Sequence, residues 1–228
     1  LRNVEREAKL QLIEQFGGSE KTLETVNRTL KWIALQQHDD GHWDFRKLRD
    51  IEGEKSTLSG GTDATAAATG FGLLPLLGNG NTHQKGPYKD HVQRGVQWLL
   101  KTQQGSGEFK RPGTSNARMY SHGIATIAIC EAYAMSGDAA LKAPAQKAID
   151  FIVKAQHKTL GGWRYNPGQS PDTSVVGWQV MAIKSAQMAN LAIPAETLDG
   201  VRTWLSRVAG KGNKLGQFGY TSSGDLKP

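Results

Sequence analysis

Apolar residues recur every three or four positions in several parts of the chain, which is the spacing of amphipathic helices. The clearest runs are Leu23, Val26, Leu30 and Ile33, then Tyr88, Val92, Val96 and Leu99. Residues 1–16 have the same spacing and predict one more helix. Three other stretches, 63–77, 120–135 and 173–189, are apolar nearly all round, as buried helices are. No stretch alternates over enough residues for a sheet, so the pattern predicts an all-α fold.

The amphipathic helices belong to an internal repeat. Its aromatic residue recurs as Trp32, Trp98, Phe151 and Trp204, at intervals of 66, 53 and 53 residues. A polar, Gly-rich insertion at 46–61 explains the longer first interval, because insertions in repeat proteins fall in loops. We predict one domain over residues 1–228, built of αα-hairpins that each pair a half-exposed outer helix with a buried inner helix. The predicted units span roughly residues 19–80, 88–138, 144–190 and 195–228.

Each of the first three units continues from the outer helix to a glutamine and then to a glycine followed by an aromatic residue. The glutamine and aromatic positions are Gln37, Trp43, Gln103, Phe109, Gln156 and Trp163. We predict structural roles for them: the amide bonds free carbonyls at the end of its own helix, and the ring packs over the next unit. The fourth unit departs from the pattern, with Arg207 in place of the glutamine and Phe218 as the later aromatic.

This order of outer helix, glutamine, glycine turn and aromatic residue resembles the QW repeat of squalene-hopene and oxidosqualene cyclases. Protein prenyltransferase β subunits share the same hairpin plan. The resemblance implies an α/α toroid, an arc of hairpins in which inner helices surround a central cavity and outer helices surround the inner ones. Three complete hairpins and a half are too few to close a ring, so we expect a segment truncated at its C-terminus, with the natural protein continuing beyond Pro228.

The motifs behind the known chemistries of these families are missing from the sequence. The Asp-x-Asp-Asp acid motif of class II terpene cyclases does not occur. Prenyltransferases hold zinc with an Asp-x-Cys pair and a later histidine, whereas here Asp172 is followed by Thr173 and Ser174, and no histidine comes after His157. Cys130 lies among apolar residues and reads as a buried thiol. We therefore predict no cofactor, with zinc as a weak alternative.

Polar residues at the starts of the predicted inner helices give a candidate site. Asp63, His122 and Asp172 would meet on one rim of the cavity, where carboxylates and an imidazole could form an acid/base or metal site. The competing interpretation for the two aspartates is helix capping. Residues predicted to line an apolar ligand site, or else to fill the core, are Phe71, Tyr120, Tyr133, Ser174 and Trp178.

Composition narrows the range of partners. The 28 Lys and Arg against 21 Asp and Glu give a net charge of +7, but the positive residues are scattered along the chain, which argues against nucleic-acid binding. The longest apolar stretch, 124–130, is too short to span a membrane.

Two hypotheses of function remain. The first is a repeat domain of a larger protein that binds an apolar or isoprenoid ligand, or a protein partner. The second is a terpenoid or polyprenyl cyclase or transferase with an acid or metal site at the inner-helix rim.

Overall fold

The computed structural model describes residues 2–50 and 60–226. Within these ranges the chain forms α-helices and short 3-10 turns, and its only β-type pairing is an isolated bridge between Ala209 and Phe218. The all-α prediction is confirmed. The helices are α1 (Arg2–Gln15), α2 (Glu20–Leu35), α3 (Thr65–Gly78), α4 (Lys89–Thr102), α5 (Arg118–Ser136), α6 (Ala139–Ala155), α7 (Thr173–Met188) and α8 (Ala195–Val208).

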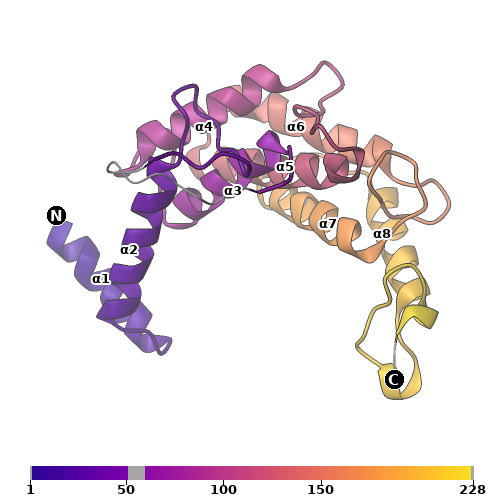
Figure 1. Ribbon diagram of the computed structural model, residues 1–228. Helices are drawn as coiled ribbons and strands as arrows, with labels where there is room; N and C mark the ends of the chain where they lie inside the picture. The colour runs from indigo at the N-terminus through magenta and orange to yellow at the C-terminus, as the bar shows by residue number, and fades with distance from the viewer. Residues whose placement is uncertain (1, 51–59, 227–228) are drawn as a thin grey trace.

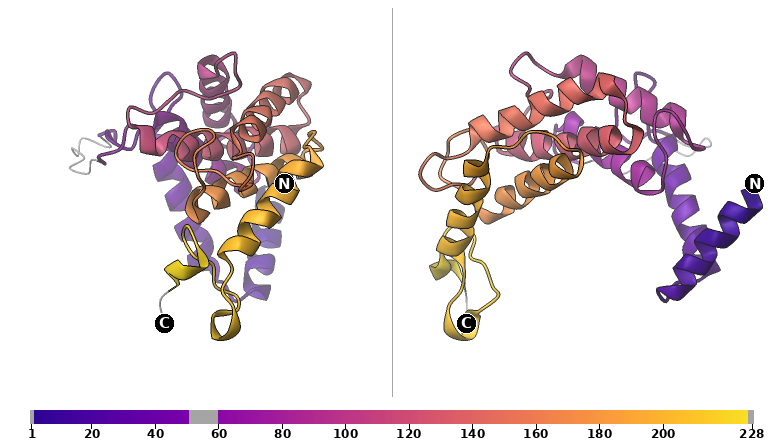
Figure 2. Two further views of the ribbon diagram at one scale, coloured as in Figure 1. Left: turned by 90° about the vertical axis from the view of Figure 1, so that its right-hand side faces the viewer. Right: turned by 180° about the vertical axis from the view of Figure 1, so that it is seen from behind.

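The helices form an arch (Figure 1). Helices α3, α5 and α7 pack side by side along its concave side, and α4 and α6 lie over them on the convex side. Helices α2 and α8 descend at the two ends, and α1 packs on α2, as the other two views also show (Figure 2). This is the predicted arc of outer and inner helices.

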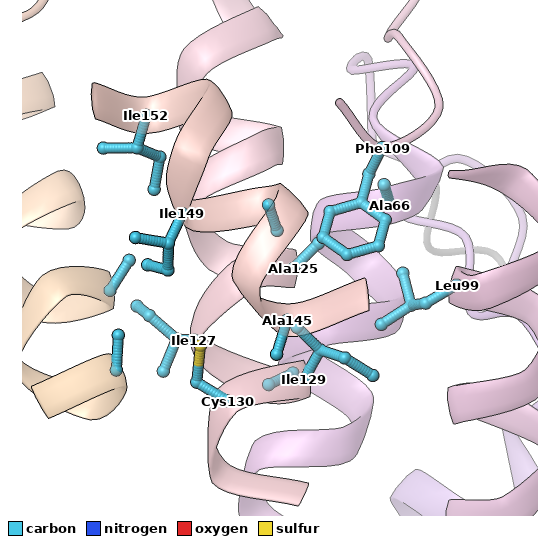
Figure 3. Close-up of a cluster of buried hydrophobic side chains, with 14 of the residues drawn as sticks. Ala66, Leu99, Phe109, Ala125, Ile127, Ile129, Cys130, Ala145, Ile149 and Ile152 are labelled. Atoms are coloured by element: carbon cyan, nitrogen blue, oxygen red, sulfur yellow. The ribbon is translucent and has the colours of Figure 1, made fainter. Parts of the chain in front are cut away.

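Helix α5 is the centre of the core. It contacts α3, α4, α6 and α7, and its side chains from Ser121 to Cys130 are all buried. Figure 3 shows its Ile127, Ile129 and Cys130 between residues of the neighbouring helices. Small and β-branched residues suit this position because they let helices approach closely on every side. Burial raises the pKa of the Cys130 thiol to about 12, so the cysteine is a core residue.

Helix α6 begins earlier than the sequence suggested. Asp138 is its N-cap, with the carboxylate accepting a hydrogen bond from the Ala140 N–H at 2.9 Å. Gly137 ends α5 in the left-handed conformation, so a two-residue turn joins the two helices. Pro144, where the predicted third unit began, lies inside α6.

Successive units are joined by what we call seams, in which the loop after one outer helix meets the next outer helix. The side-chain amide of each seam glutamine donates to two carbonyls, one on the loop glycine and one on the next outer helix. The pairs are Gln37 to Gly41 (2.8 Å) and His91 (2.9 Å), Gln103 to Gly107 (3.1 Å) and Pro144 (2.9 Å), and Gln156 to Gly161 (2.7 Å) and Thr197 (2.9 Å). The glutamines thus cross-link neighbouring units, and the expected bonds to the end of their own helix are replaced by these.

Glycine is required at the loop position of each seam. Gly41, Gly107 and Gly161 have φ of 102°, 90° and 74°, where other residues are strained. A Cβ atom on them would lie 2.0–2.4 Å from a backbone carbonyl oxygen of the next outer helix. The carbonyls belong to Arg94, Lys147 and Gly200, which occupy the same position of the repeat. Close approach of the next helix therefore depends on these glycines.

The aromatic residue of each seam is buried. The indole N–H of Trp43 donates to the Ile33 carbonyl at 2.7 Å, and that of Trp163 donates to Ile152 at 2.8 Å. The Trp43 ring lies against Gly72 of α3 and Gly95 of α4; a Cβ on Gly72 would clash with the ring, and one on Gly95 would lie 3.0 Å from it. The ring therefore fills the space between its own inner helix and the next outer helix.

The fourth unit has a modified seam loop. Ala209 ends α8 with φ −64° and ψ 136°, close to Gln103 (−67°, 128°) and Gln156 (−62°, 138°) at the ends of α4 and α6. The N–H of the next residue, Gly210, donates to the residue just before Phe218, as in the earlier loops. Ala209, not Arg207, therefore occupies the glutamine position. A longer loop between Gly210 and Phe218 hid this register in the sequence.

Candidate functional site

The starts of the inner helices lie side by side, as predicted for one rim of the arc. The Ala67 N–H of α3 donates to the Ser121 hydroxyl of α5 at 3.1 Å. The Gln179 amide of α7 donates to the Met119 carbonyl of α5 at 3.0 Å. Polar groups at these helix starts are therefore neighbours.

Asp172 is a buried carboxylate that caps α7. Its Oδ1 accepts from the Val175 N–H at 2.9 Å and from the Ser174 hydroxyl at 2.6 Å. Its Oδ2 lies 3.7 Å from the Arg164 Nε and has no hydrogen-bond partner among the described residues. One carboxylate oxygen of Asp172, Oδ1, therefore caps the helix, as the competing interpretation from the sequence proposed.

Three tyrosines gather beside Asp172. The Tyr120 hydroxyl lies 2.5 Å from the Ser174 Oγ, so two of the predicted ligand residues are in contact. The Tyr165 and Tyr220 hydroxyls are 2.9 Å apart, and burial raises the pKa of Tyr120. Its hydrogen bond to Tyr165 raises the pKa of Tyr220.

Sequence reasoning missed Arg164, Tyr165 and Tyr220 as members of this cluster. They lie in loops, where no helical periodicity predicts which side chains face the rim. The signal available was their place in the repeat, since Tyr165 and Tyr220 each come two residues after a seam aromatic.

Asp63 lies at the start of α3 but does not cap it. The N-cap residue is Ala64, and no side chain caps that helix end. The Asp63 carboxylate instead pairs with Arg46 at 3.2 Å, and both groups are partly exposed. The capping interpretation is wrong for this residue, because the chain enters the helix one residue later.

His122 is buried behind the rim, between α5 and α6. Its Nδ1 accepts from the Phe109 N–H at 3.3 Å, and its Nε2 lies 3.0 Å from the Ala148 carbonyl, which places the ring proton on Nε2. The ring packs against Phe151 with centroids 4.6 Å apart. Burial lowers the pKa of His122 to about 4, so the ring is neutral and links α5, α6 and the second seam loop.

The predicted acid/base or metal constellation is not brought together. Asp63 pairs with Arg46, His122 faces α6, and only Asp172 joins other predicted site residues, Ser174 and Tyr120. In the part of the chain that the structure describes, no three His, Cys, Asp or Glu side chains are grouped so that they could hold a metal ion.

Two of the predicted ligand-binding aromatics, the exposed Phe71 and the half-buried Trp178, are in contact. Phe71 of α3 meets Trp178 of α7 edge to face, with ring centroids 5.5 Å apart. Phe45 extends the row at 6.1 Å from Phe71, and Met181 follows Trp178 on the exposed face of α7. Trp178 also packs against the small cluster that contains Ile124 of α5. We call Phe45, Phe71, Trp178 and Met181 the aromatic strip; Tyr133 lies apart from it, packed against the core.

The arc of hairpins, with its glutamine, glycine and aromatic seams, defines a class of protein. In its helical arc and its sequence the chain is similar to the squalene-cyclase-like and prenyltransferase-like α/α toroids. The sequence model of the squalene-hopene cyclase C-terminal domain matches residues 8–120, just under half of the chain, which run from α1 to the start of α5.

A named relative is similar over part of this region. Protostadienol synthase A of Arthroderma gypseum is 28% identical over 102 residues. The match covers 44% of this chain and spans 13% of the length of that synthase. In the described ranges no helix is long and apolar enough to cross a membrane.

Proposed function

We propose that this chain is a binding domain for an apolar, isoprenoid-type ligand, which lies against the aromatic strip formed by α3, α7 and the loop residue Phe45. The observation that carries the proposal is the exposure of the strip. Phe45, Phe71 and Met181 are large apolar side chains left accessible to solvent, although α3 and α7 are otherwise well packed. Contiguous exposed apolar side chains mark ligand or partner sites.

The chemistry of the strip suits a hydrocarbon chain. Aromatic faces and a flexible methionine give apolar contact without fixed polar partners. Ser174 lies on the same helix as Trp178, one turn nearer its start, beside the N-cap Asp172 and Tyr120 of α5. The hydroxyls there could hold the polar end of an isoprenoid alcohol. The relative named as a synthase of protostadienol is consistent with this class of ligand.

A titration with geranylgeraniol, followed by tryptophan fluorescence, tests the proposal. We expect saturable binding that weakens about tenfold in Phe71→Ala, because roughly 1–2 kcal/mol of ring contact is lost. Trp178→Phe should remove most of the fluorescence change. Phe16→Ala removes an exposed ring at the end of α1, away from the strip, and should leave the affinity unchanged. Absence of saturable binding, or an equal loss in Phe16→Ala, would contradict the proposal.

The ligand recovered from this titration also separates binding from the enzymatic alternative, a cyclase or transferase that acts through a carboxyl group at the inner-helix rim. Asp172 is the residue that favours this alternative, because its carboxyl is buried beside the hydroxyls of Tyr120 and Ser174. Mass spectrometry of the recovered ligand decides between them. Recovery of unchanged ligand supports the binding function. Formation of a product that is absent with Asp172→Asn would support the enzymatic function instead.

A further inference from the structure

Tyr120, Ser174 and Asp172 are linked by hydrogen bonds into what we call the polar triad. The Ser174 hydroxyl donates to the Asp172 Oδ1 at 2.6 Å, and the Tyr120 hydroxyl lies 2.5 Å from the Ser174 Oγ. Asp172 is fully buried, Tyr120 is half-buried and Ser174 is exposed. The triad therefore connects a carboxylate in the interior to hydroxyl groups at the surface.

The direction of both hydrogen bonds follows from the number of protons available. The Asp172 Oδ1 also accepts from the Val175 N–H at 2.9 Å, so it acts as an acceptor and takes the single hydroxyl proton of Ser174. The Ser174 Oγ then has only lone pairs to offer, which makes the Tyr120 hydroxyl the donor in the second bond. Burial raises the pKa of Tyr120, so the phenol keeps this proton at neutral pH.

Both hydroxyl protons of the triad are therefore used within it, and its surface offers acceptors only. The oxygen of Tyr120 keeps a lone pair for a bound molecule after its proton has gone to Ser174. The buried Asp172 Oδ2, which has no hydrogen-bond partner among the described residues, adds negative potential beneath the hydroxyls. A hydroxyl group that donates fits such a surface, whereas the lone pairs of an ether or ketone oxygen are repelled by it.

The polar triad lies next to the aromatic strip. Helices α5 and α7, which carry Tyr120 and Ser174, pack side by side along the concave side of the arch (Figure 1). Ser174 and Met181 are both exposed and lie seven residues apart, so they are on the same face of α7, with Trp178 between them. A ligand whose hydrocarbon part covers the strip therefore brings its polar end to the triad.

We propose that the polar triad selects the polar end of the ligand by hydrogen-bond direction. It binds an isoprenoid alcohol, whose hydroxyl donates to Tyr120, in preference to the corresponding ether or ketone. The proposal rests on the proposed function and adds the class of polar end that the site takes. A protonated amine would also donate, but Arg164, whose Nε lies 3.7 Å from the Asp172 Oδ2, already places a positive charge there. A neutral hydroxyl is therefore the group that fits.

Titrations with geranylgeraniol and with its methyl ether, each followed by tryptophan fluorescence, test the proposal. The two molecules have the same hydrocarbon chain and one oxygen, but the ether has no proton to donate. We expect the wild type to bind the alcohol about tenfold more tightly, because the ether loses one hydrogen bond and sets lone pairs against lone pairs. Tyr120→Phe keeps the ring and removes the acceptor, so the two affinities should then agree within about twofold.

Ser174→Ala tests the direction of the hydrogen bonds. Without Ser174, the Tyr120 hydroxyl is free to donate to the ligand, so the affinity for the ether should rise about threefold or more. A preference caused by the size of the methyl group would persist in Tyr120→Phe and would not change in Ser174→Ala. Tyr133→Phe removes a hydroxyl near the other end of α5 and is the matched control, which should keep the tenfold preference. Circular dichroism checks that each variant keeps its helices.

The outcomes separate this proposal from the proposed function. Saturable binding of both molecules with equal affinity in the wild type would overturn the selectivity and leave the apolar binding function standing. A preference that persists in Tyr120→Phe, or an ether affinity that does not rise in Ser174→Ala, would also overturn it. Absence of saturable binding of either molecule would contradict both proposals.

Discussion

At the start of α5, burial decides what a titratable side chain can do. His122 is enclosed by α6 and the second seam loop, and both ring nitrogens are used by backbone groups. Asp63 lies two residues before the neighbouring helix α3, is partly exposed to solvent and pairs with Arg46. The two residues, both expected at the starts of inner helices, therefore have different chemistry.

We predict that His122 makes stability fall in acid. Its pKa is about 4 in the folded chain and near 6.5 when unfolded, so the unfolded state binds the proton more readily. The free energy of unfolding is unaffected by His122 above pH 6.5 and decreases as the pH falls. The decrease is complete below about pH 4, where it reaches roughly 3 kcal/mol. Urea unfolding at several pH values should show the stability difference between wild type and His122→Gln narrowing from pH 7 to pH 4. A constant difference would refute this.

At the scale of the elements, the seam glycines control how closely outer helices approach. We predict that Gly107→Ala destabilises the chain by about 3 kcal/mol or more, because positive φ strain is joined by a clash with the Lys147 carbonyl. Gly216→Ala has nearly the same φ without a clash and should cost about 1–2 kcal/mol. Thermal unfolding of both variants at low protein concentration measures the difference. Equal losses would show that conformation alone matters.

The helices could be predicted because each carries its own periodic signal. The inner helices were found from uninterrupted apolar composition, and α7 begins at the expected residue, Thr173. The fourth unit could not be aligned correctly with the others, because alanine at position 209 is not distinctive and the loop that follows it is longer. The start of α6 was misplaced because the predicted unit began at residue 144, whereas Asp138 caps the helix.

The candidate site was predictable only in part. Adjacent helix starts place Asp172, Ser174 and Tyr120 together, since repeat geometry brings equivalent positions side by side. Helix rotation, which the sequence does not fix, turns His122 toward α6. Tyr165 and Tyr220 reach the cluster through loop conformations that no periodicity encodes.

For the whole molecule, stability should decrease from the middle of the arch toward its α1 end. Helix α5 is enclosed by four helices, whereas α1 packs mainly on α2 (Figure 1). We predict that amide hydrogens of α5 exchange at least ~100-fold more slowly than those of α1, because local opening at the end breaks few contacts. Hydrogen exchange with mass spectrometry measures this. Equal protection of α1 and α5 would mean that the arch opens as one unit.

The glutamine cross-links also determine how the arch responds to its surroundings. In the second and third seams each joins an uncharged amide to backbone carbonyls, so acid cannot protonate the link and added salt has no ion pair to screen. Curvature should therefore stay the same from one cellular medium to another. A molecule bound along the concave side would therefore contact inner helices whose spacing stays constant.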